Sequence, residues 1–140
     1  MRKYTVSDFA EYPVVFLTGG LLYGAIEIGF RGHTHWSMLI TGGACLAAFH
    51  YACKRLKRRN IFIKCLAGCL IITLFEFIAG CVVNLVFNLG VWDYSGRFLN
   101  ICGQICPLFS LFWFLLCLPA ALLCNLLSRL FTRQRDEESI

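Results

Sequence analysis

The sequence has few charged residues, and this scarcity narrows the classes of protein that it can encode. Asp, Glu, Lys and Arg together make up 15% of the 140 residues, whereas a soluble domain usually carries about a quarter. Hydrophobic residues reach 59% and gather in four runs, at residues 13–30, 36–53, 65–89 and 105–127. Runs of this length cross a bilayer as helices. The composition therefore excludes an ordinary soluble domain and predicts one all-α, polytopic membrane domain with four transmembrane helices.

Several chemical motifs are also missing. The chain has no GxxxxGK[ST] sequence, which excludes ATP hydrolysis by a P-loop of its own. Cys65 and Cys69, and likewise Cys102 and Cys106, are four apart, but no histidine lies near either pair to complete a metal site. The two histidines of the 31–37 connection alternate and give only a weak metal signal. We therefore expect no metal or other cofactor, and we expect the nine cysteines to fill helix contacts as small hydrophobic residues.

The runs divide the chain into three parts. Residues 1–12 are predicted to form a cytoplasmic or interfacial N-terminus, 13–127 the transmembrane domain, and 128–140 a cytoplasmic tail. Pro13 suits the first position of the first helix. The charged tail is expected to be disordered beyond Arg133.

Two stretches of the chain also echo each other. Ile-Glu-Ile at 26–28 and Phe-Glu-Phe at 75–77 each precede a tryptophan, a serine and a glycine-containing start of the next helix. This pattern predicts a parallel repeat, in which 13–53 corresponds to 61–127.

Basic residues are distributed unevenly between the connections. If the four runs cross the membrane in turn, one side holds eleven of the 13 basic residues and the other holds Arg31 and Arg97. Cytoplasmic loops carry such an excess, so both termini and the basic loop are predicted to be cytoplasmic, in a chain that spans the cell membrane several times. Small dual-topology multidrug transporters need nearly balanced charge, so the bias argues against that class. The eleven are Arg2, Lys3, Lys54, Arg55, Lys57, Arg58, Arg59, Lys64, Arg129, Arg133 and Arg135.

The third run contains an acid, Glu76. Helical spacing places Thr73, Glu76, Gly80, Asn84 and Asn88 along one side of that helix. An unpaired polar group in hydrocarbon costs on the order of several kcal/mol, so this side of the helix, called here the polar seam, must face protein or water. Acids inside membrane spans mark transport or proton pathways, and the same groups also serve as interhelical glue.

More polar residues gather on the opposite side from the basic loop. Glu27 and Arg31 are four apart and can form an ion pair. The segment GVWDYSGRFLNICGQICP, between the third and fourth runs, is predicted to be interfacial or re-entrant, because such backbone needs protein or a wet cavity to cover it. The full candidate site comprises Glu76, Asn84, Asn88, Glu27, Arg31, Asp93, Asn100 and Gln104, with Trp92, Tyr94 and Arg97 as gate or interfacial residues.

The densest positive cluster is KRLKRRN at 54–60. Its position between two runs favours an orientation signal over nucleic-acid binding. The alternative is recognition of an anionic lipid headgroup. The residues proposed for that contact are Lys54, Arg55, Lys57, Arg58 and Arg59.

Three stretches near the fourth run are distinctive: the WDYS tetrapeptide at 92–95, FLNICGQIC at 98–106, and FSLFW at 109–113. Through them, and over roughly residues 15–120, the chain resembles a bacterial family of small polytopic membrane proteins labelled putative ABC-transporter type IV, CmpB-like. The resemblance implies a membrane protein of a transporter type, in the bacterial inner membrane.

Two functions remain open from the sequence. The first is a small transporter or channel subunit centred on Glu76, forming a homo-oligomer or joining a partner membrane subunit because four helices enclose little space. The second is a non-transporting partner, regulatory or lipid-binding protein that uses the seam for helix packing. A membrane enzyme acting on lipid would need a base, a nucleophile or a metal within reach of one another, and only His33 and His35, on the same side as Asp93, keep that alternative open.

Overall fold

The computed structural model describes residues 6–138. It consists of helices α1 (Val6–Arg31), α2 (Trp36–Arg55), α3 (Ile61–Gly80) and α4 (Pro107–Glu138), with a π-helical segment η1 (Cys81–Val86) that continues α3. The described residues contain no strand, and an isolated β-bridge joins Ile101 to Ile105 in the segment before α4. The all-α prediction is therefore confirmed over this part of the chain.

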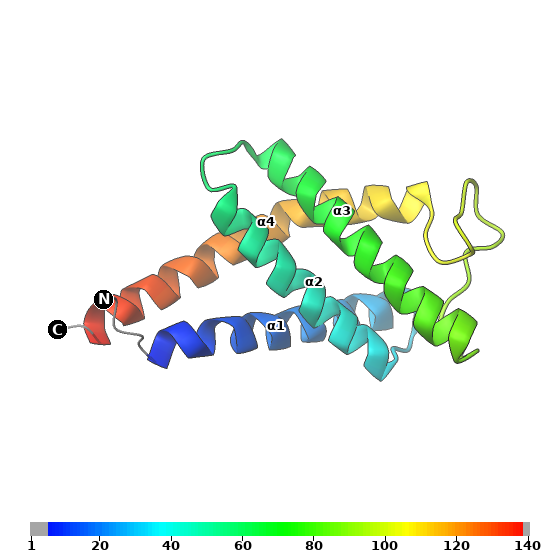
Figure 1. Ribbon diagram of the computed structural model, residues 1–140, viewed down its shortest axis with the longest axis horizontal. Helices are drawn as coiled ribbons and strands as arrows, with labels where there is room; N and C mark the ends of the chain where they lie inside the picture. The colour runs from blue at the N-terminus through cyan, green and yellow to red at the C-terminus, as the bar shows by residue number, and fades with distance from the viewer. Residues whose placement is uncertain (1–5, 139–140) are drawn as a thin grey trace.

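The four helices alternate in direction. Lys54, near the end of α2, contacts Glu11 near the start of α1, so α2 returns the chain to the end of the molecule at which α1 begins. Arg135, near the end of α4, reaches the same Glu11 at 3.4 Å. Figure 1 shows α1 and α4 meeting at this end and diverging toward the 87–106 segment, while α2 and α3 cross in front of them.

The first helix begins earlier than its sequence predicts. Pro13 lies inside α1, not at its first position. Proline in a helix interior removes a backbone hydrogen bond and is normally costly. Here the turn before it is supported by tertiary contacts, because Ser7 and Glu11 are both buried. The prediction of a helix start at Pro13 is wrong for this reason.

The last helix runs further than predicted. The expected disorder beyond Arg133 is wrong, since α4 continues to Glu138. Phe131 is buried, and Arg135 bonds to Glu11 of α1. These contacts with the start of α1 stabilise a stretch that composition alone assigns to a solvated tail.

Glycines set the close approach of α1 and α2. A Cβ atom at Gly20 would lie 2.7 Å from the carbonyl oxygen of Leu39, and one at Gly24 would lie 2.6 Å from the Cδ2 atom of the same leucine. Gly19 is equally confined, because a Cβ atom there would lie 2.6 Å from the carbonyl oxygen of Gly42. Small residues at such spacing let helix backbones approach closely in a membrane.

Cysteines fill much of the core, as expected. All nine are free thiols, and six of them are buried. Cys53, Cys65, Cys117 and Cys124 pack with larger apolar side chains in one hydrophobic cluster, where they behave as small hydrophobic residues.

Three helical stretches are long and apolar enough to cross a membrane among the residues that were described: Phe9–Arg31, Ile61–Val86 and Pro107–Glu138. The remaining helix, α2, has 20 residues but does not belong to this set. Its more polar residues face the bundle, since Ser37, Thr41 and His50 are all buried. The lower hydropathy of α2 therefore reflects side chains that neighbouring helices cover.

The α1–α2 contact gives a test of the packing. We expect Gly19→Ala to destabilise the protein by about 1–3 kcal/mol, because the new methyl group overlaps backbone atoms of α2. Gly29→Ala in the same helix is the matched control, since nothing lies within 4 Å of a Cβ atom there. Thermal unfolding in detergent measures both. Equal melting temperatures for the two variants would contradict this account of the interface.

Candidate functional site

The carboxyl group of Glu76 is the centre of the candidate site. Its side chain leaves α3 toward the interior, and the residue is only 3% exposed. The hydroxyl group of Tyr23, from α1, donates a short hydrogen bond to Oε1. The indole Nε1 of Trp113, from α4, donates to Oε2 at 2.9 Å. Side chains from two other helices therefore satisfy both oxygens of an acid that would be unstable in hydrocarbon.

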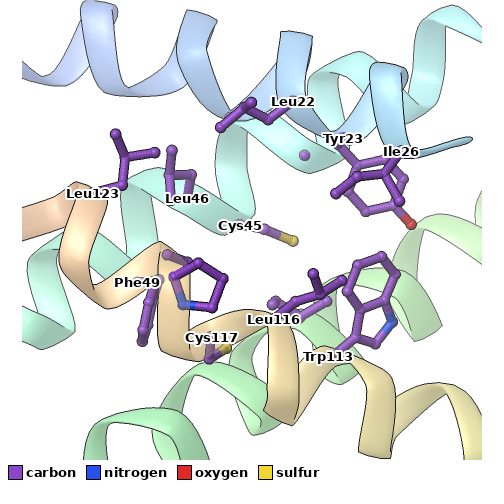
Figure 2. Close-up of a pocket in the computed structure, with 15 residues that line it drawn as sticks. Leu22, Tyr23, Ile26, Cys45, Leu46, Phe49, Trp113, Leu116, Cys117 and Leu123 are labelled. Atoms are coloured by element: carbon purple, nitrogen blue, oxygen red, sulfur yellow. The ribbon is translucent and has the colours of Figure 1, made fainter. Parts of the chain in front are cut away.

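The two aromatic donors also face each other. The rings of Tyr23 and Trp113 are stacked, with centroids 5.2 Å apart and planes inclined by 24°. They form one end of a cavity of about 270 Å³ between α1, α2 and α4. Figure 2 shows Leu22, Tyr23 and Ile26 on one side of this cavity, with Trp113 and Leu116 opposite. Apart from the polar tips of these aromatic rings, the cavity wall is apolar.

A second cavity of about 370 Å³ lies on the other side of the same pair of rings. It shares Tyr23, Ile26, Trp113 and Leu116 with the first cavity and extends to Glu27 and Arg31. The aromatic pair thus separates two cavities between α1 and α4, of which the first is apolar and the second is bordered by the charged side chains of Glu27 and Arg31.

Glu27 and Arg31 form the expected ion pair, with Nη2 of Arg31 donating to Oε1 of Glu27. The second oxygen of Glu27 accepts a hydrogen bond from the hydroxyl of Thr34 at 2.8 Å. Arg31 also donates to the carbonyl oxygen of Val91 at 2.6 Å. These contacts fasten the end of α1 to the 87–106 segment.

A separate polar group lies beyond Glu76 along the third helix. Nδ2 of Asn84 donates to Oε1 of Gln104 at 2.8 Å, and Oδ1 of Asn84 accepts from the backbone N–H of Val91 at 2.7 Å. The indole N–H of Trp92 donates to the carbonyl oxygen of Gln104 at 3.0 Å. Gly80 makes room for this group, because a Cβ atom there would lie 2.5 Å from Oε1 of Gln104.

Asn88, expected at the end of the seam, does not lie on it. The π-helical segment ends at Val86, and Asn88 is exposed with a positive φ of 52°. The wider turn of a π-helix changes the register on which the spacing argument depends. At the other end of the seam, the hydroxyl groups of Thr73 and Ser110 lie 3.0 Å apart, joining α3 to α4.

The remaining candidates shape the 87–106 segment. Oδ1 of Asp93 accepts from the backbone N–H of Ser95 at 2.8 Å, and hydrogen bonds from Ser95 lower the pKa of this exposed carboxyl group. Nδ2 of Asn100 donates to the carbonyl oxygen of Arg97 at 2.9 Å, and its Oδ1 accepts from the N–H of Gly103 at 3.0 Å. Asp93 and Asn100 thus fold the segment and lie apart from Glu76 in their contacts.

Two of the three predicted gate or interfacial residues, Tyr94 and Arg97, contact Phe109 of α4. The Tyr94 ring stacks on the Phe109 ring at 4.6 Å, and burial raises the pKa of its phenol. The guanidinium of Arg97 lies 5.7 Å from the centre of the same phenylalanine ring.

Sequence reasoning missed both partners of Glu76. Tyr23 stands four residues before Glu27, so helical spacing places it on the same face of α1. Trp113 lies three residues after Ser110, which contacts Thr73 of α3. Aromatic residues in apolar runs do not reveal that their polar atoms bind an acid.

A second buried acid, Glu11, was also missed. It is 2% exposed and bonds to Nε2 of His50 at 2.8 Å, to the ammonium of Lys54, and to Arg135 at 3.4 Å. His50 is itself fully buried, and its Nδ1 has no hydrogen-bond partner among the described residues. This cluster joins α1, α2 and α4 at the end opposite to Glu27.

Among the described residues, no group of three or more His, Cys, Asp or Glu side chains is arranged to hold a metal ion. Beside the carboxyl group of Glu76 the structure places one phenol and one indole. Such a set can bind a proton or a cation.

Breaking the Glu11 cluster provides a test of its role. We expect Glu11→Gln to destabilise the protein by about 2 kcal/mol, because a buried carboxylate pairs with several basic groups there, some of them partly exposed. Glu137→Gln is the matched control, since its partner Arg133 is 81% exposed and such pairs contribute less than about 1 kcal/mol. Melting temperatures in detergent give both values. A decrease in melting temperature for Glu137→Gln as large as that for Glu11→Gln would contradict the prediction.

Comparison with known proteins agrees with the resemblance seen in the 92–106 segment. A family model described as Putative ABC-transporter type IV matches residues 16–137, which is most of the chain. No curated protein and no solved structure matches the chain. The family description is that of a transporter type and not of an enzyme class. With its long apolar helices and this match, the chain is a membrane protein that belongs to the putative ABC-transporter type IV family.

Proposed function

We propose that this protein is the membrane subunit of a transporter for organic cations, and that Glu76 is the group to which the cation or a proton binds. The observation that carries the proposal is the position of Glu76 directly behind two stacked aromatic rings that line two cavities. The family description supports the broader statement, since it is that of a transporter type.

The chemistry of the rings favours a cation. A cation within about 6 Å of the face of a Trp or Tyr ring is attracted by the ring quadrupole, by about 2 kcal/mol when water is excluded. Tyr23 and Trp113 present such rings to apolar spaces, and their polar ends hold the acid. A lipophilic cation seated there would have aromatic faces beside it and a carboxyl group within one side chain's reach. Exchange of that cation for the proton of Glu76 would couple transport to a proton gradient.

The route to the site would run between α1 and α4. The two cavities lie between these helices; the wall of the first is almost entirely apolar, and the second is apolar except where Glu27 and Arg31 line it. At the outer end the charges of Glu27 and Arg31 neutralise each other. An amphipathic substrate could therefore reach Tyr23 and Trp113 from the lipid phase without crossing an unpaired charge.

The proposed topology has four membrane crossings with both ends of the chain in the cytoplasm. The alternation in helix direction supports it, because α2 returns the chain from the Glu27 end to the Glu11 end. The basic residues gather at the Glu11 end, as expected for the cytoplasmic side.

The proposal includes a further subunit. Four helices enclose little space, so a homo-oligomer or a partner membrane subunit would complete the pathway. The chain has no P-loop sequence, and ATP-driven transport would therefore require a partner chain that supplies one.

A second function has one observation in its favour. Both oxygens of Glu76 are already paired, with Tyr23 and Trp113, which is also what an acid acting only as interhelical glue would show. In that case the protein would be a non-transporting partner, regulatory or lipid-binding subunit, and the aromatic pair would serve only helix packing.

Transport through Glu76 can be measured with tetraphenylphosphonium as the probe cation in proteoliposomes that contain a pH-sensitive dye. We expect the parent protein to exchange the probe for protons. The exchange rate of Glu76→Gln is expected to be at least tenfold lower, because the amide neither binds a proton at neutral pH nor attracts a cation. Glu137→Gln, in the exposed part of α4, is expected to keep the parent rate.

Two results would contradict the transporter proposal. One is probe uptake by Glu76→Gln at the parent rate. The other is the absence of exchange in the parent protein together with a lowered melting temperature of Glu76→Gln, which would assign Glu76 to helix packing alone.

The topology can be tested with fusions to green fluorescent protein and to alkaline phosphatase. We expect fluorescent fusions after Asn60 and after Ile140, and an active phosphatase after Gly32, because α2 is proposed to cross the membrane. If α2 does not cross, the fusions after Gly32 and Asn60 will report the same side.

A further inference from the structure

A large basic cleft lies at the Glu11 end of the molecule, away from Glu76. Its volume is about 800 Å³, and its walls come from the end of α2, the 56–60 connection, the start of α3 and the last part of α4. The basic side chains in its lining are Lys54, Lys57, Lys64, Arg129 and Arg133, against a single acid, Asp136.

Much of this positive charge is not neutralised by the protein. Lys54 bonds to Glu11, and Arg133 bonds to the exposed Glu137. Within residues 6–138, Lys57, Lys64 and Arg129 form no ion pair with a carboxylate. Like charges that gather in a concave space raise the local concentration of an anion. The orientation rule explains why basic residues lie at this end, but it does not require them to converge from separate helices on one cavity.

The cleft also offers neutral hydrogen-bonding groups. Asn125, Ser128 and Thr132 line it from α4, at the spacing of three and four residues that keeps side chains on one helix face. Arg129 and Arg133 lie on the same face. Guanidinium, ammonium and amide donors around one cavity are the groups that recognise phosphate oxygens.

We propose that this cleft binds a phosphate-bearing ligand, either the headgroup of an anionic lipid or a soluble polyphosphate, through Lys57, Lys64 and Arg129. The volume exceeds what a single inorganic phosphate fills, and it leaves room for a second phosphate or a glycerol group. This site differs from the lipid contact expected from the sequence. Lys54 and Lys57 remain in it, whereas Arg55, Arg58 and Arg59 do not line the cleft, and Arg55 instead bonds to the hydroxyl of Tyr51.

The experiment compares two probes on the purified protein in a neutral detergent at constant ionic strength. Pyrophosphate represents the soluble ligand, and dioctanoyl-phosphatidylglycerol represents the lipid headgroup. Because a ligand that binds only the folded state raises the melting temperature by an amount that grows with the logarithm of its concentration relative to Kd, each titration yields an apparent Kd. We expect at least one probe to raise the melting temperature of the parent. A response to the lipid alone assigns a headgroup site, and a response to pyrophosphate alone assigns a soluble ligand.

The matched variants carry equal charge changes. Lys64→Gln combined with Arg129→Gln removes two cations of the cleft, and we expect the apparent Kd to weaken at least tenfold. Arg58→Gln combined with Arg59→Gln removes two cations from the same end of the protein but outside the cleft, and we expect the parent Kd. No response to either probe, or an equal loss in both double variants, would overturn the proposal.

A pair of single variants tests the site independently, in case the double variant misfolds. Lys57 and Arg58 are exposed neighbours in the 56–60 connection, and only Lys57 lines the cleft. Lys57→Gln is expected to weaken binding of the responding probe about threefold or more, and Arg58→Gln is expected to leave it unchanged. The same effect from both single variants would show a diffuse positive surface and would also overturn the site.

Discussion

The carboxyl group of Glu76 joins three helices, and the arrangement of the bundle depends on keeping that group sheltered. α3 supplies the acid, α1 supplies the hydroxyl of Tyr23, and α4 supplies the indole of Trp113. Hydrocarbon offers no replacement for either donor, so separation of one helix would leave a buried polar atom unpaired. The two hydrogen bonds therefore fix the distance between α1 and α4 at one level. The two cavities lie on either side of that level.

The rest of the packing divides the bundle into two tight pairs. Gly19 and Gly20 bring α1 against α2. α3 and α4 are held by Gly68, where a Cβ atom would lie 2.5 Å from the sulfur of Cys117, and by the bond between Thr73 and Ser110. Between the pairs, an apolar cluster joins Cys53 of α2, Cys65 of α3 and Cys117 of α4. Polar contacts add to it: Glu11 at one end, Glu76 at the centre, and Arg31 with Val91 at the other end. The two pairs are therefore held together by apolar packing as well as by polar contacts.

The sequence was sufficient to predict the features that follow from helical periodicity and from composition. Helical spacing correctly placed Glu27 beside Arg31, and the cost of a polar group in lipid correctly required Glu76 to be buried. It failed where distant contacts decide local structure. The extra turns at the start of α1 and the end of α4 exist because Glu11 and Arg135 meet across the fold, and no local pattern reports that meeting. Likewise, the π-helical segment before Asn88 breaks the register that spacing assumes.

The contacts of the polar seam also narrow the candidate site. Asn84 and Gln104 use their amide groups on each other, on the N–H of Val91 and on the carbonyl oxygen of Cys102, so they hold the 87–106 segment against the end of the third helix. Asp93 and Asn100 likewise bond to backbone atoms of that segment. Polar atoms engaged in this way are poor ligands for a passing substrate, because each new contact would break an existing one. What remains beside the cavities is the carboxyl group of Glu76 behind its two rings and the Glu27–Arg31 pair at the edge of the second cavity. The seam that looks continuous in the sequence is therefore two structures: polar contacts that hold the 87–106 segment, and a separate acidic centre between α1 and α4.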